Sequence, residues 1–458
     1  MDYYKPEQLE QWDKQYVWHP FTQMRQWQKE KPLIIAKGEG SYLYDLEGNK
    51  YLDGISSLWV TVHGHRKKEI NRAIIEQLDQ LAHSTLLGQA NIPSTLLARK
   101  LVEITPEGLN KVFYSESGST AVEIGLKIAY QYWQQRGEEK YKTKRKFVSL
   151  ANAYHGDTIG SVSVGGINLF HKIFAGLLFE TVNAPSPYCY RCPLHLNRES
   201  CTMDCVREME SLLADHHHEI AGVVIEPLVQ GAAGMLVAPE GYLAGVRELC
   251  TRFDVLLIAD EVAVGFGRTG KMFACAHENV KPDIMCLAKG ITGGYLPLAA
   301  TMVTDEIYQA FLGEIDECRT FYHGHTYTGN PVACAAALAN LELFARDQLI
   351  AGLQEKIAFF SADLKRFMEL QHVGDVRQKG VMAGIEIVGN KAAKEPFAIK
   401  YNIPHRIVLE ARKNGLIIRP LDNVIVLMPI LSMSLAELKR LLDITYAAIR
   451  KVTEEEAL

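Results

Sequence analysis

No stretch of this sequence approaches the roughly 18 to 20 uninterrupted apolar residues that a membrane-spanning helix requires. The N-terminus, MDYYKPEQLEQWDKQYVWHP, lacks the basic segment followed by an apolar segment that is typical of a signal peptide. We therefore expect a cytoplasmic protein that does not span a membrane.

An excess of charge of one sign is also missing, because 49 Lys and Arg residues face 54 Asp and Glu residues. A net charge of -5 gives no general attraction to nucleic acid or to anionic lipid. Internal repeats, low-complexity linkers and Pro/Gly-rich hinges are absent, and the hydrophobic content of 48% is ordinary for a globular protein. The composition therefore favours a globular protein that acts on small molecules.

The nine cysteines are an odd number, which argues against a disulfide framework. Four of them lie close together in YCYRCPLHLNRESCTMDC, namely Cys189, Cys192, Cys201 and Cys205. Their spacing suits a structural zinc site or an iron–sulfur cluster, but also a surface insertion with free or reversibly oxidised thiols. We favour the surface insertion and predict no metal site.

Short apolar runs rich in Val, Ile and Leu recur along the middle of the chain. They are KVFYS, KFVSLAN, AGVVIEP, VLLIADEV, DIMCLAKG and LAATMVT, and several are separated by helical segments such as STAVEIGLKIAYQYWQ. Such runs indicate strands that are buried on both faces, and the alternation with helices indicates a mainly parallel α/β sheet.

The two ends of the chain have a different pattern. SYLYDLEGNKYLDG predicts a hairpin, and after about Asn340 long helices precede the strand-like segments GVMAGIEIV, LIIRP and VIVLMPI. Ser434 and Glu437 form a capping box at the start of a closing helix. We predict a large domain and a smaller α+β lobe built from both termini, with the boundaries 1–66 (small lobe), 67–340 (large domain) and 341–458 (small lobe).

The segment LLIADEVAVGFGRTGK contains two nucleotide-binding patterns. Gly265, Gly267 and Gly270 spell the dinucleotide fingerprint, and with Lys271 they nearly spell a P-loop. The dinucleotide site needs a long helix after the glycines, but the following KMFACAHENVKPD is too short to provide one. The P-loop needs Ser or Thr after the lysine, where this chain has Met272. Both nucleotide interpretations are therefore rejected.

A carboxylate and a lysine end two successive apolar runs, at Asp260 and at Lys289. If the two strands are sheet neighbours, both side chains face the crevice at the carboxyl edge, where open α/β sheets bind ligands. This pair suggests pyridoxal phosphate, with Lys289 forming the Schiff base and then acting as a base, and Asp260 pairing with the pyridinium nitrogen.

Two further segments complete this cofactor site. YSESGSTAVEIGLK predicts a strand, a turn at Ser117, Gly118 and Ser119, and a helix whose free N–H groups bind the phosphate. ANAYHGD places Tyr154 and His155 in a loop after a strand, where an aromatic face covers the cofactor ring.

Taken together, IADEVAVGFGRTG, CLAKGITGG, YHGD, SGSTAVE and HGHTYTGNP resemble the class III, or ω, aminotransferases, which are pyridoxal phosphate enzymes of fold type I. WHPFTQM and ISSLWVTVHGH resemble, more narrowly, the 7,8-diaminononanoate synthases of biotin biosynthesis, which aminate 8-amino-7-oxononanoate. The resemblance implies ping-pong transamination of small-molecule substrates by a homodimer with shared active sites. It also explains GFGRTGK as a loop that places Arg268 near the entrance or the cofactor.

The resemblance implies a role for individual residues. Lys289, Asp260 and Tyr154 would be catalytic, Thr326 would reach the phosphate of the neighbouring subunit, and Arg419 would bind the substrate carboxylate. The residues implied to bind the cofactor are Ser117, Gly118, Ser119, Tyr154, His155, Glu226, Asp260, Val262, Lys289, Gly324, His325 and Thr326. The residues implied to bind substrate are Phe21, Trp59, Tyr154, Gly324 and Arg419.

Three positions depart from the S-adenosylmethionine-dependent members of this group. Phe21 replaces a tyrosine, Leu58 replaces the first of two tryptophans, and His325 replaces a proline. Losing a hydroxyl and an indole weakens the case for a sulfonium donor, so we favour L-lysine over S-adenosylmethionine as amino donor. The alternatives are a general ω-aminotransferase for β-alanine, taurine or diamines with pyruvate, and a catalytically silent binding protein of the same fold.

Overall fold

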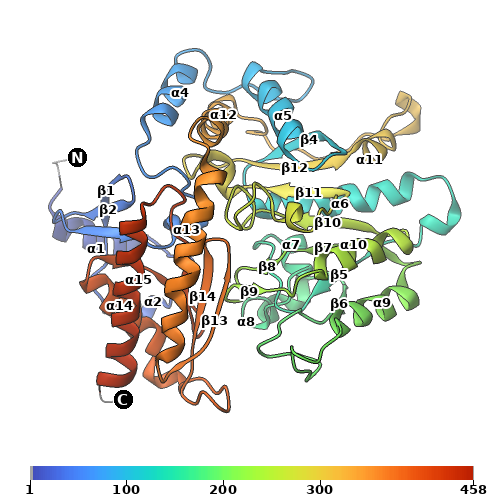
Figure 1. Cartoon of the computed structure of the whole chain (residues 1–458). Coiled ribbons are helices and arrows are strands. Elements are labelled where there is room, and N and C mark those ends of the chain that lie inside the picture. The colour runs from blue at the N-terminus through green and yellow to red at the C-terminus, as the bar shows by residue number, and fades with distance from the viewer. Residues whose placement is uncertain (1–3, 457–458) are drawn as a thin grey trace.

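The computed structural model describes residues 4–456 and is centred on a seven-stranded sheet (Figure 1). Every strand pair in it is parallel except those of β12, which is antiparallel to both neighbours. The mainly parallel sheet predicted from the sequence is thus confirmed. In spatial order the strands are β4 (Leu109–Ser115), β12 (Ala299–Thr304), β11 (Ile284–Leu287), β10 (Leu256–Asp260), β7 (Ile220–Ile225), β5 (Lys146–Leu150) and β6 (Val182–Ala184).

Helices cover both faces of this sheet, which explains why its strands are apolar throughout. In β10, Ile258 packs in the core cluster of α6, whereas Leu257 packs in the cluster that contains α9 and α10. No helix within residues 4–456 has both the length and the apolarity to cross a membrane. The helices of this part of the chain are α4 (Lys68–Leu78), α5 (Ile92–Ile104), α6 (Gly118–Gln135), α7 (Ile159–Ser163), α8 (Asn168–His171), α9 (Asp204–His216), α10 (Tyr242–Arg252), α11 (Asp305–Gln309) and α12 (Pro331–Arg346).

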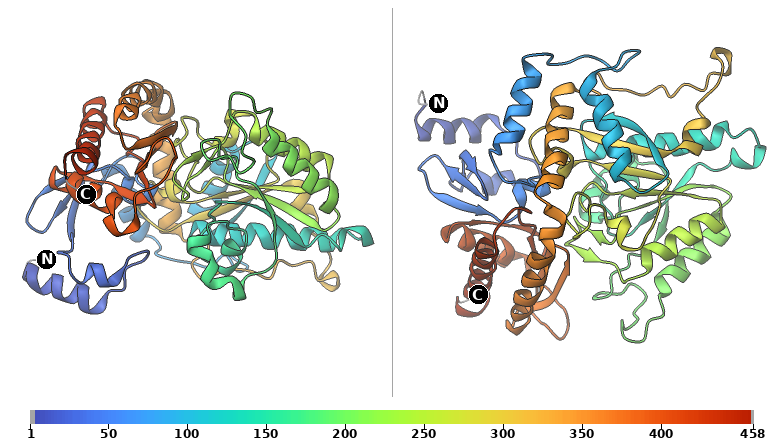
Figure 2. Two further views of the ribbon diagram at one scale, coloured as in Figure 1. Left: turned by 90° about the horizontal axis from the view of Figure 1, so that it is seen from below. Right: turned by 45° about the horizontal axis from the view of Figure 1, so that its top comes forward.

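The two ends of the chain lie side by side at one end of the large sheet, as the blue and red segments of Figures 1 and 2 show. The C-terminal strand β15 (Leu416–Ile417) pairs in parallel with β3 (Lys50–Asp53), so one small sheet contains strands from both ends. The predicted lobe built from both termini is therefore present. Its remaining N-terminal elements are α1 (Pro6–Tyr16), α2 (Met24–Trp27), β1 (Ile35–Glu39), β2 (Tyr42–Asp45) and α3 (Ser56–Trp59).

A second small sheet is antiparallel and has the order β13-β14-β17-β16. Helix α12 runs continuously through residue 340. The domain boundaries at 66 and 340 stay predictions. Residues 1–3 and 457–458 of the predicted lobe lie outside the described residues. The C-terminal elements are α13 (Leu349–Leu364), β13 (Val373–Lys379), β14 (Met382–Ile387), α14 (Ile403–Lys413), β16 (Arg419–Leu421), β17 (Val424–Leu427) and α15 (Leu435–Arg450). A short hairpin, β8 (Val229–Gln230) and β9 (Leu236–Val237), belongs to the large domain.

The capping box predicted for the closing helix is present at the start of α15. The Ser434 hydroxyl accepts a hydrogen bond from the Glu437 backbone N–H at 3.3 Å, and the Ser434 N–H donates to Glu437 Oε2 at 2.8 Å. The helix that begins here buries Leu438, Leu441 and Leu442 in the core of the small lobe.

We predict that Ser434→Ala lowers the free energy of unfolding by about 1 kcal/mol, because the Glu437 N–H in the first turn loses its side-chain acceptor. Urea denaturation of the cofactor-free protein measures the change, and Ser434→Thr, which keeps the hydroxyl, should recover most of it. Equal urea midpoints for the Ala variant and the wild-type protein would contradict this prediction.

Candidate active site

A cavity of about 760 Å³ opens at the carboxyl edge of the large sheet. Strands β10 and β11 are parallel neighbours with Asp260 opposite Cys286, so Lys289 follows at the same edge. The predicted strand arrangement is thus confirmed, and both side chains reach one cavity. The predicted site residues that line this cavity are Trp59, Ser117, Gly118, Ser119, Tyr154, His155, Glu226, Asp260, Val262 and Lys289.

The carboxylate of Asp260 is buried and oriented on both oxygens. His155 Nδ1 lies 2.7 Å from Oδ2, and the Val262 N–H donates to Oδ1 at 3.0 Å. Burial alone would lower the pKa of His155, but its hydrogen bond to Asp260 and the negative charge there outweigh burial and raise it. His155 and the Val262 N–H therefore hold the Asp260 carboxylate in one orientation at the edge of the cavity.

Lys289 follows β11 with an unusual backbone conformation, since its φ of 48° lies in the left-handed region that non-glycine residues rarely adopt. Burial lowers the pKa of its ammonium group, although the negative charge of Asp260 opposes the shift. Its Nζ lies 4.7 Å from the centroid of the Trp59 ring. A half-buried lysine with a lowered pKa is suited to act as a nucleophile and as a base.

Glu226 connects two backbone segments beside the cavity. Its Oε1 accepts the Tyr154 N–H at 3.0 Å and its Oε2 accepts the Gly231 N–H at 2.8 Å. Burial raises the pKa of Glu226 to about 7, while the positive charge of His155 opposes this shift. Glu226 thus orients the loop that carries Tyr154.

Tyr154 and Arg419 come from different lobes and lie close enough to interact electrostatically. The Tyr154 hydroxyl donates to Asp157 Oδ2 at 2.8 Å, and burial together with Asp157 raises the pKa of Tyr154. Burial lowers the pKa of Arg419, which is half-buried on β16, and Tyr154 opposes that shift. The sequence predicts no role for Asp157, although this residue stands three positions after Tyr154 in the YHGD motif.

The start of α6 has the geometry of an anion site. Ser117 caps this helix, and Ser119 in its first turn accepts the Thr158 N–H at 3.0 Å. A Cβ at Gly118 would overlap Val262 Cγ1, so glycine is the residue that fits beside Val262, two positions after Asp260. The N–H groups of this first turn lack partners within the helix and favour a phosphate at this end of the cavity.

The other predicted residues, Phe21, Gly324, His325, Thr326 and Arg419, do not line the cavity of their own chain. Phe21 is 56% exposed, and its ring packs on Phe170, whose ring centroid lies 6.2 Å from that of Tyr154. Gly324 and His325 line a separate groove, and Thr326 is exposed. His325 approaches the cavity only through its Nδ1, which lies 2.5 Å from Oε2 of the cavity residue Glu116.

The loop GFGRTGK is part of the support of the cavity wall. Arg268 is fully buried and not at an entrance: its guanidinium donates to Ser56 Oγ and to the carbonyl oxygens of Pro429 and Thr61 at 2.9 to 3.1 Å. Only a short 3₁₀ turn, Ala274–His277, follows the loop, which agrees with rejecting the nucleotide interpretations.

The four clustered cysteines line a separate small cavity of about 60 Å³, and all of them are free thiols. Within residues 4–456, no group of three or more His, Cys, Asp or Glu side chains is arranged to hold a metal ion.

The residues of the main cavity fit pyridoxal phosphate. They combine a half-buried lysine, a buried carboxylate at Asp260 and a helix N-terminus. In the part of the chain that the structure describes, Trp59 Nε1 and Glu116 Oε1 are buried at this site without a hydrogen-bond partner. The fold and the site therefore define a pyridoxal-phosphate-dependent transferase of fold type I.

The model of the aminotransferase class-III family matches residues 23–449, and the chain belongs to this family. It is 54% identical to the adenosylmethionine-8-amino-7-oxononanoate aminotransferase of Geobacter sulfurreducens, over 98% of this chain and 99% of the relative. The crystal structure of the enzyme of that name from Methanocaldococcus jannaschii is 50% identical, with a TM-score of 0.93, over 98% of this chain and 99% of that chain. An (S)-enantioselective omega-transaminase from Thermomicrobium roseum has the same TM-score of 0.93 at 35% identity, over 99% of this chain and 100% of that chain. The chain is accordingly a pyridoxal-phosphate-dependent aminotransferase.

We predict that Gly118→Ala weakens cofactor binding about 10-fold, because the new methyl group forces α6 away from Val262. Titration of the cofactor-free protein with pyridoxal phosphate, followed by visible absorbance, measures the affinity. Gly352→Ala is the matched control, since a Cβ there has no neighbour within 4 Å among the described residues. An unchanged affinity in the Gly118 variant would argue against a phosphate site at this helix end.

Proposed function

We propose that the chain transfers an amino group to 8-amino-7-oxononanoate and forms 7,8-diaminononanoate in biotin biosynthesis. The observation that carries this proposal is the 54% identity, over nearly the full length of both chains, to an enzyme named for this acceptor. Two residues support it: Arg419, which interacts electrostatically with the cavity residue Tyr154, offers a guanidinium for the substrate carboxylate, and Trp59 offers an apolar wall.

In this proposal the residues of the chain divide the chemistry between them. When bound, pyridoxal phosphate supplies an electron sink for the negative charge that develops at the substrate carbon. Asp260 would face the ring nitrogen, and the N-terminus of α6 would hold the phosphate. Lys289, with its lowered pKa, would move a proton between the substrate carbon and the cofactor carbon.

The amino donor is either L-lysine or S-adenosylmethionine. Phe21 and Leu58 are 56% and 47% exposed, and neither offers the hydroxyl or the second indole expected beside a sulfonium donor, which favours lysine. The name of the Geobacter relative favours adenosylmethionine for that protein. Because the two donors differ in charge and bulk, one experiment separates them.

A donor half-reaction is expected to bleach the visible absorbance of the bound cofactor, because the amino group passes to it before any acceptor is present. The protein with pyridoxal phosphate is mixed separately with L-lysine, S-adenosylmethionine or β-alanine, and 8-amino-7-oxononanoate is then added to restore the absorbance. Bleaching by lysine or S-adenosylmethionine, with recovery on adding the acceptor, supports the proposal. Bleaching by β-alanine alone, with recovery by pyruvate, would instead indicate a general ω-aminotransferase.

Lys289→Ala is expected to reduce turnover to background, because the amine that moves the proton is lost, while noncovalent cofactor binding remains. Steady-state assays of the purified variant measure turnover, and Lys271→Ala, which changes an exposed lysine of the same region, should retain activity. Substantial turnover in the Lys289 variant would disprove the assigned mechanism.

The active unit is proposed to be a homodimer in which Thr326 contacts the phosphate bound by the partner subunit. Thr326 is exposed and lies outside the cavity of its own chain. Large apolar side chains near it are also exposed, with exposed fractions of 73% for Leu87, 80% for Tyr322 and 61% for Tyr327. Such a surface is typical of one that a second subunit covers.

We predict that the protein elutes as a dimer in size-exclusion chromatography with light scattering. Thr326→Ala should weaken cofactor binding about 10-fold, because one hydrogen bond to a charged phosphate is lost. Thr320→Ala, at an exposed position of the same segment, is the matched control. A monomer that binds the cofactor with full affinity would rule out the shared site.

A further inference from the structure

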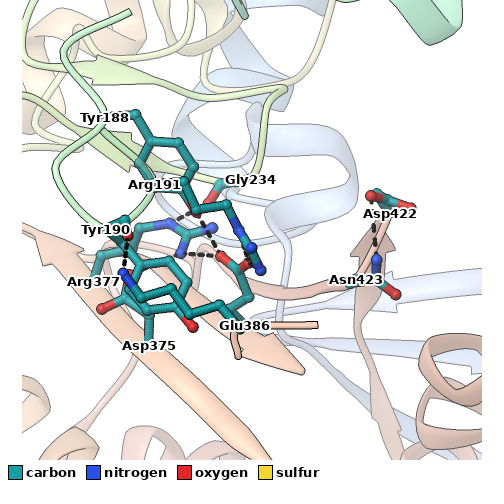
Figure 3. Close-up of polar contacts among 10 residues, drawn as sticks. Tyr188, Tyr190, Arg191, Gly234, Asp375, Arg377, Glu386, Asp422 and Asn423 are labelled. Atoms are coloured by element: carbon teal, nitrogen blue, oxygen red, sulfur yellow. Dashed lines mark hydrogen bonds and ion pairs between the residues drawn. The ribbon is translucent and has the colours of Figure 1, made fainter. Parts of the chain in front are cut away.

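A buried cluster of charged residues lies on the antiparallel sheet of the small lobe (Figure 3). The carboxylate of Glu386 accepts hydrogen bonds from Arg377 Nη1 at 2.7 Å, from Arg191 Nε and Nη2 at 2.9 and 2.6 Å, and from the Tyr188 hydroxyl at 2.7 Å. Burial alone would raise the pKa of Glu386, but Arg377, Tyr188 and Arg191 lower it. The cluster is therefore an ionised carboxylate with two guanidinium partners.

Arg377 differs from Arg191, which is exposed, in that it is buried and also contacts the turn between β8 and β9. Its Nε donates to the carbonyl oxygen of Gly234 at 2.8 Å (Figure 3). Gly234 has a φ of +98°, and a Cβ there would lie 3.1 Å from Arg377 Nη2 and 2.7 Å from Val424 Cγ2. The tight turn 231–234, between β8 and β9, thus packs directly against the guanidinium.

The same face of the small sheet carries the proposed carboxylate ligand. Arg377 pairs with Gly384, Gly384 pairs with Val426, and Val426 pairs with Arg419. Residues directly opposite one another across antiparallel strands point to the same face, so Arg377 and Arg419 share the face that meets the large domain.

The other end of the turn reaches the active-site cavity. The Gly231 N–H donates to Glu226 Oε2 at 2.8 Å. A Cβ at Gly231 would lie 3.3 Å from Trp59 Cζ3 and 3.6 Å from Trp59 Cη2, so the backbone here packs against the benzo edge of the indole. A displacement of the turn would therefore remove a packing contact from Trp59 and a hydrogen bond from Glu226.

We propose that Arg377 is a positioning residue that, oriented by Glu386, fixes the turn 231–234 against Trp59 and so sets the width of the cavity for a long aliphatic acceptor. The inference rests on the proposed function, because it assigns the Trp59 wall to 8-amino-7-oxononanoate. Arg377 suits this role because one planar guanidinium binds the Glu386 carboxylate and the Gly234 carbonyl at the same time. A lysine ammonium keeps the charge but cannot span both groups in this geometry.

The test compares Arg377→Lys with Arg191→Lys. Both variants keep a cation beside Glu386 and lose guanidinium hydrogen bonds, but only Arg377 contacts the turn. Arg377→Lys is expected to raise KM for 8-amino-7-oxononanoate about 10-fold, because a small displacement of the wall weakens acceptor binding. Its donor half-reaction should stay within about 2-fold of the wild-type rate, since Lys289 and Asp260 are untouched. Arg191→Lys should match the wild-type protein in both measurements.

Thermal unfolding of both variants shows whether they are comparably folded. A rise in acceptor KM confined to Arg377→Lys supports the proposal. Equal effects of the two substitutions, or an equal loss in both half-reactions, would overturn it, since either result means that Arg377 acts only through stability. If the wild-type protein itself fails to aminate 8-amino-7-oxononanoate, the proposed acceptor is wrong, and the role of Arg377 toward it is overturned as well.

Discussion

The buried pair of His155 and Asp260 is the interaction on which the organisation of the site depends. A buried carboxylate needs hydrogen-bond partners, because burial removes water from its oxygens. His155 and the Val262 N–H bind one oxygen of Asp260 each. The pair exists only because β10 ends beside the loop after β5, with β7 between the two strands. The order of the parallel strands therefore determines which groups orient the Asp260 carboxylate in the cavity.

The substrate side of the cavity depends on contacts between the lobes. Ser56, Ser57 and Trp59 all have positive φ, a conformation that costs energy for residues other than glycine and persists only where the surroundings fix it. Arg268 supplies part of that fixation by binding Ser56 Oγ together with a carbonyl oxygen of the C-terminal segment. Trp59 is thus oriented by the loop that follows Asp260, which couples the substrate wall to the cofactor site.

The cofactor residues could be predicted from the sequence because their chemistry is local. Asp260 and Lys289 each end an apolar strand, and Ser117 precedes a helix, so strand order alone brings them together. The cluster around Glu386 could not be predicted in this way. Strand β13 reads VGDVRQK, a pattern that indicates a solvated edge, and its Arg377 is buried because Gly234 and Tyr188 pack on it from distant segments. The strand β6 was missed because three residues carry too little periodicity.

The residues proposed for the reaction and those proposed for substrate choice lie in different parts of the fold. Lys289, Asp260 and the start of α6 belong to the central sheet and its helices, where any change in backbone geometry would affect cofactor binding itself. Arg419 and Arg377 belong to a small sheet that interacts with Tyr154 and with the glycine turn 231–234 beside the cavity. Under the proposed function, substitutions in that sheet would alter the acceptor site while the Asp260 pair stays intact. Since one fold hosts many substrates when its site residues vary, we propose that the small lobe determines acceptor specificity.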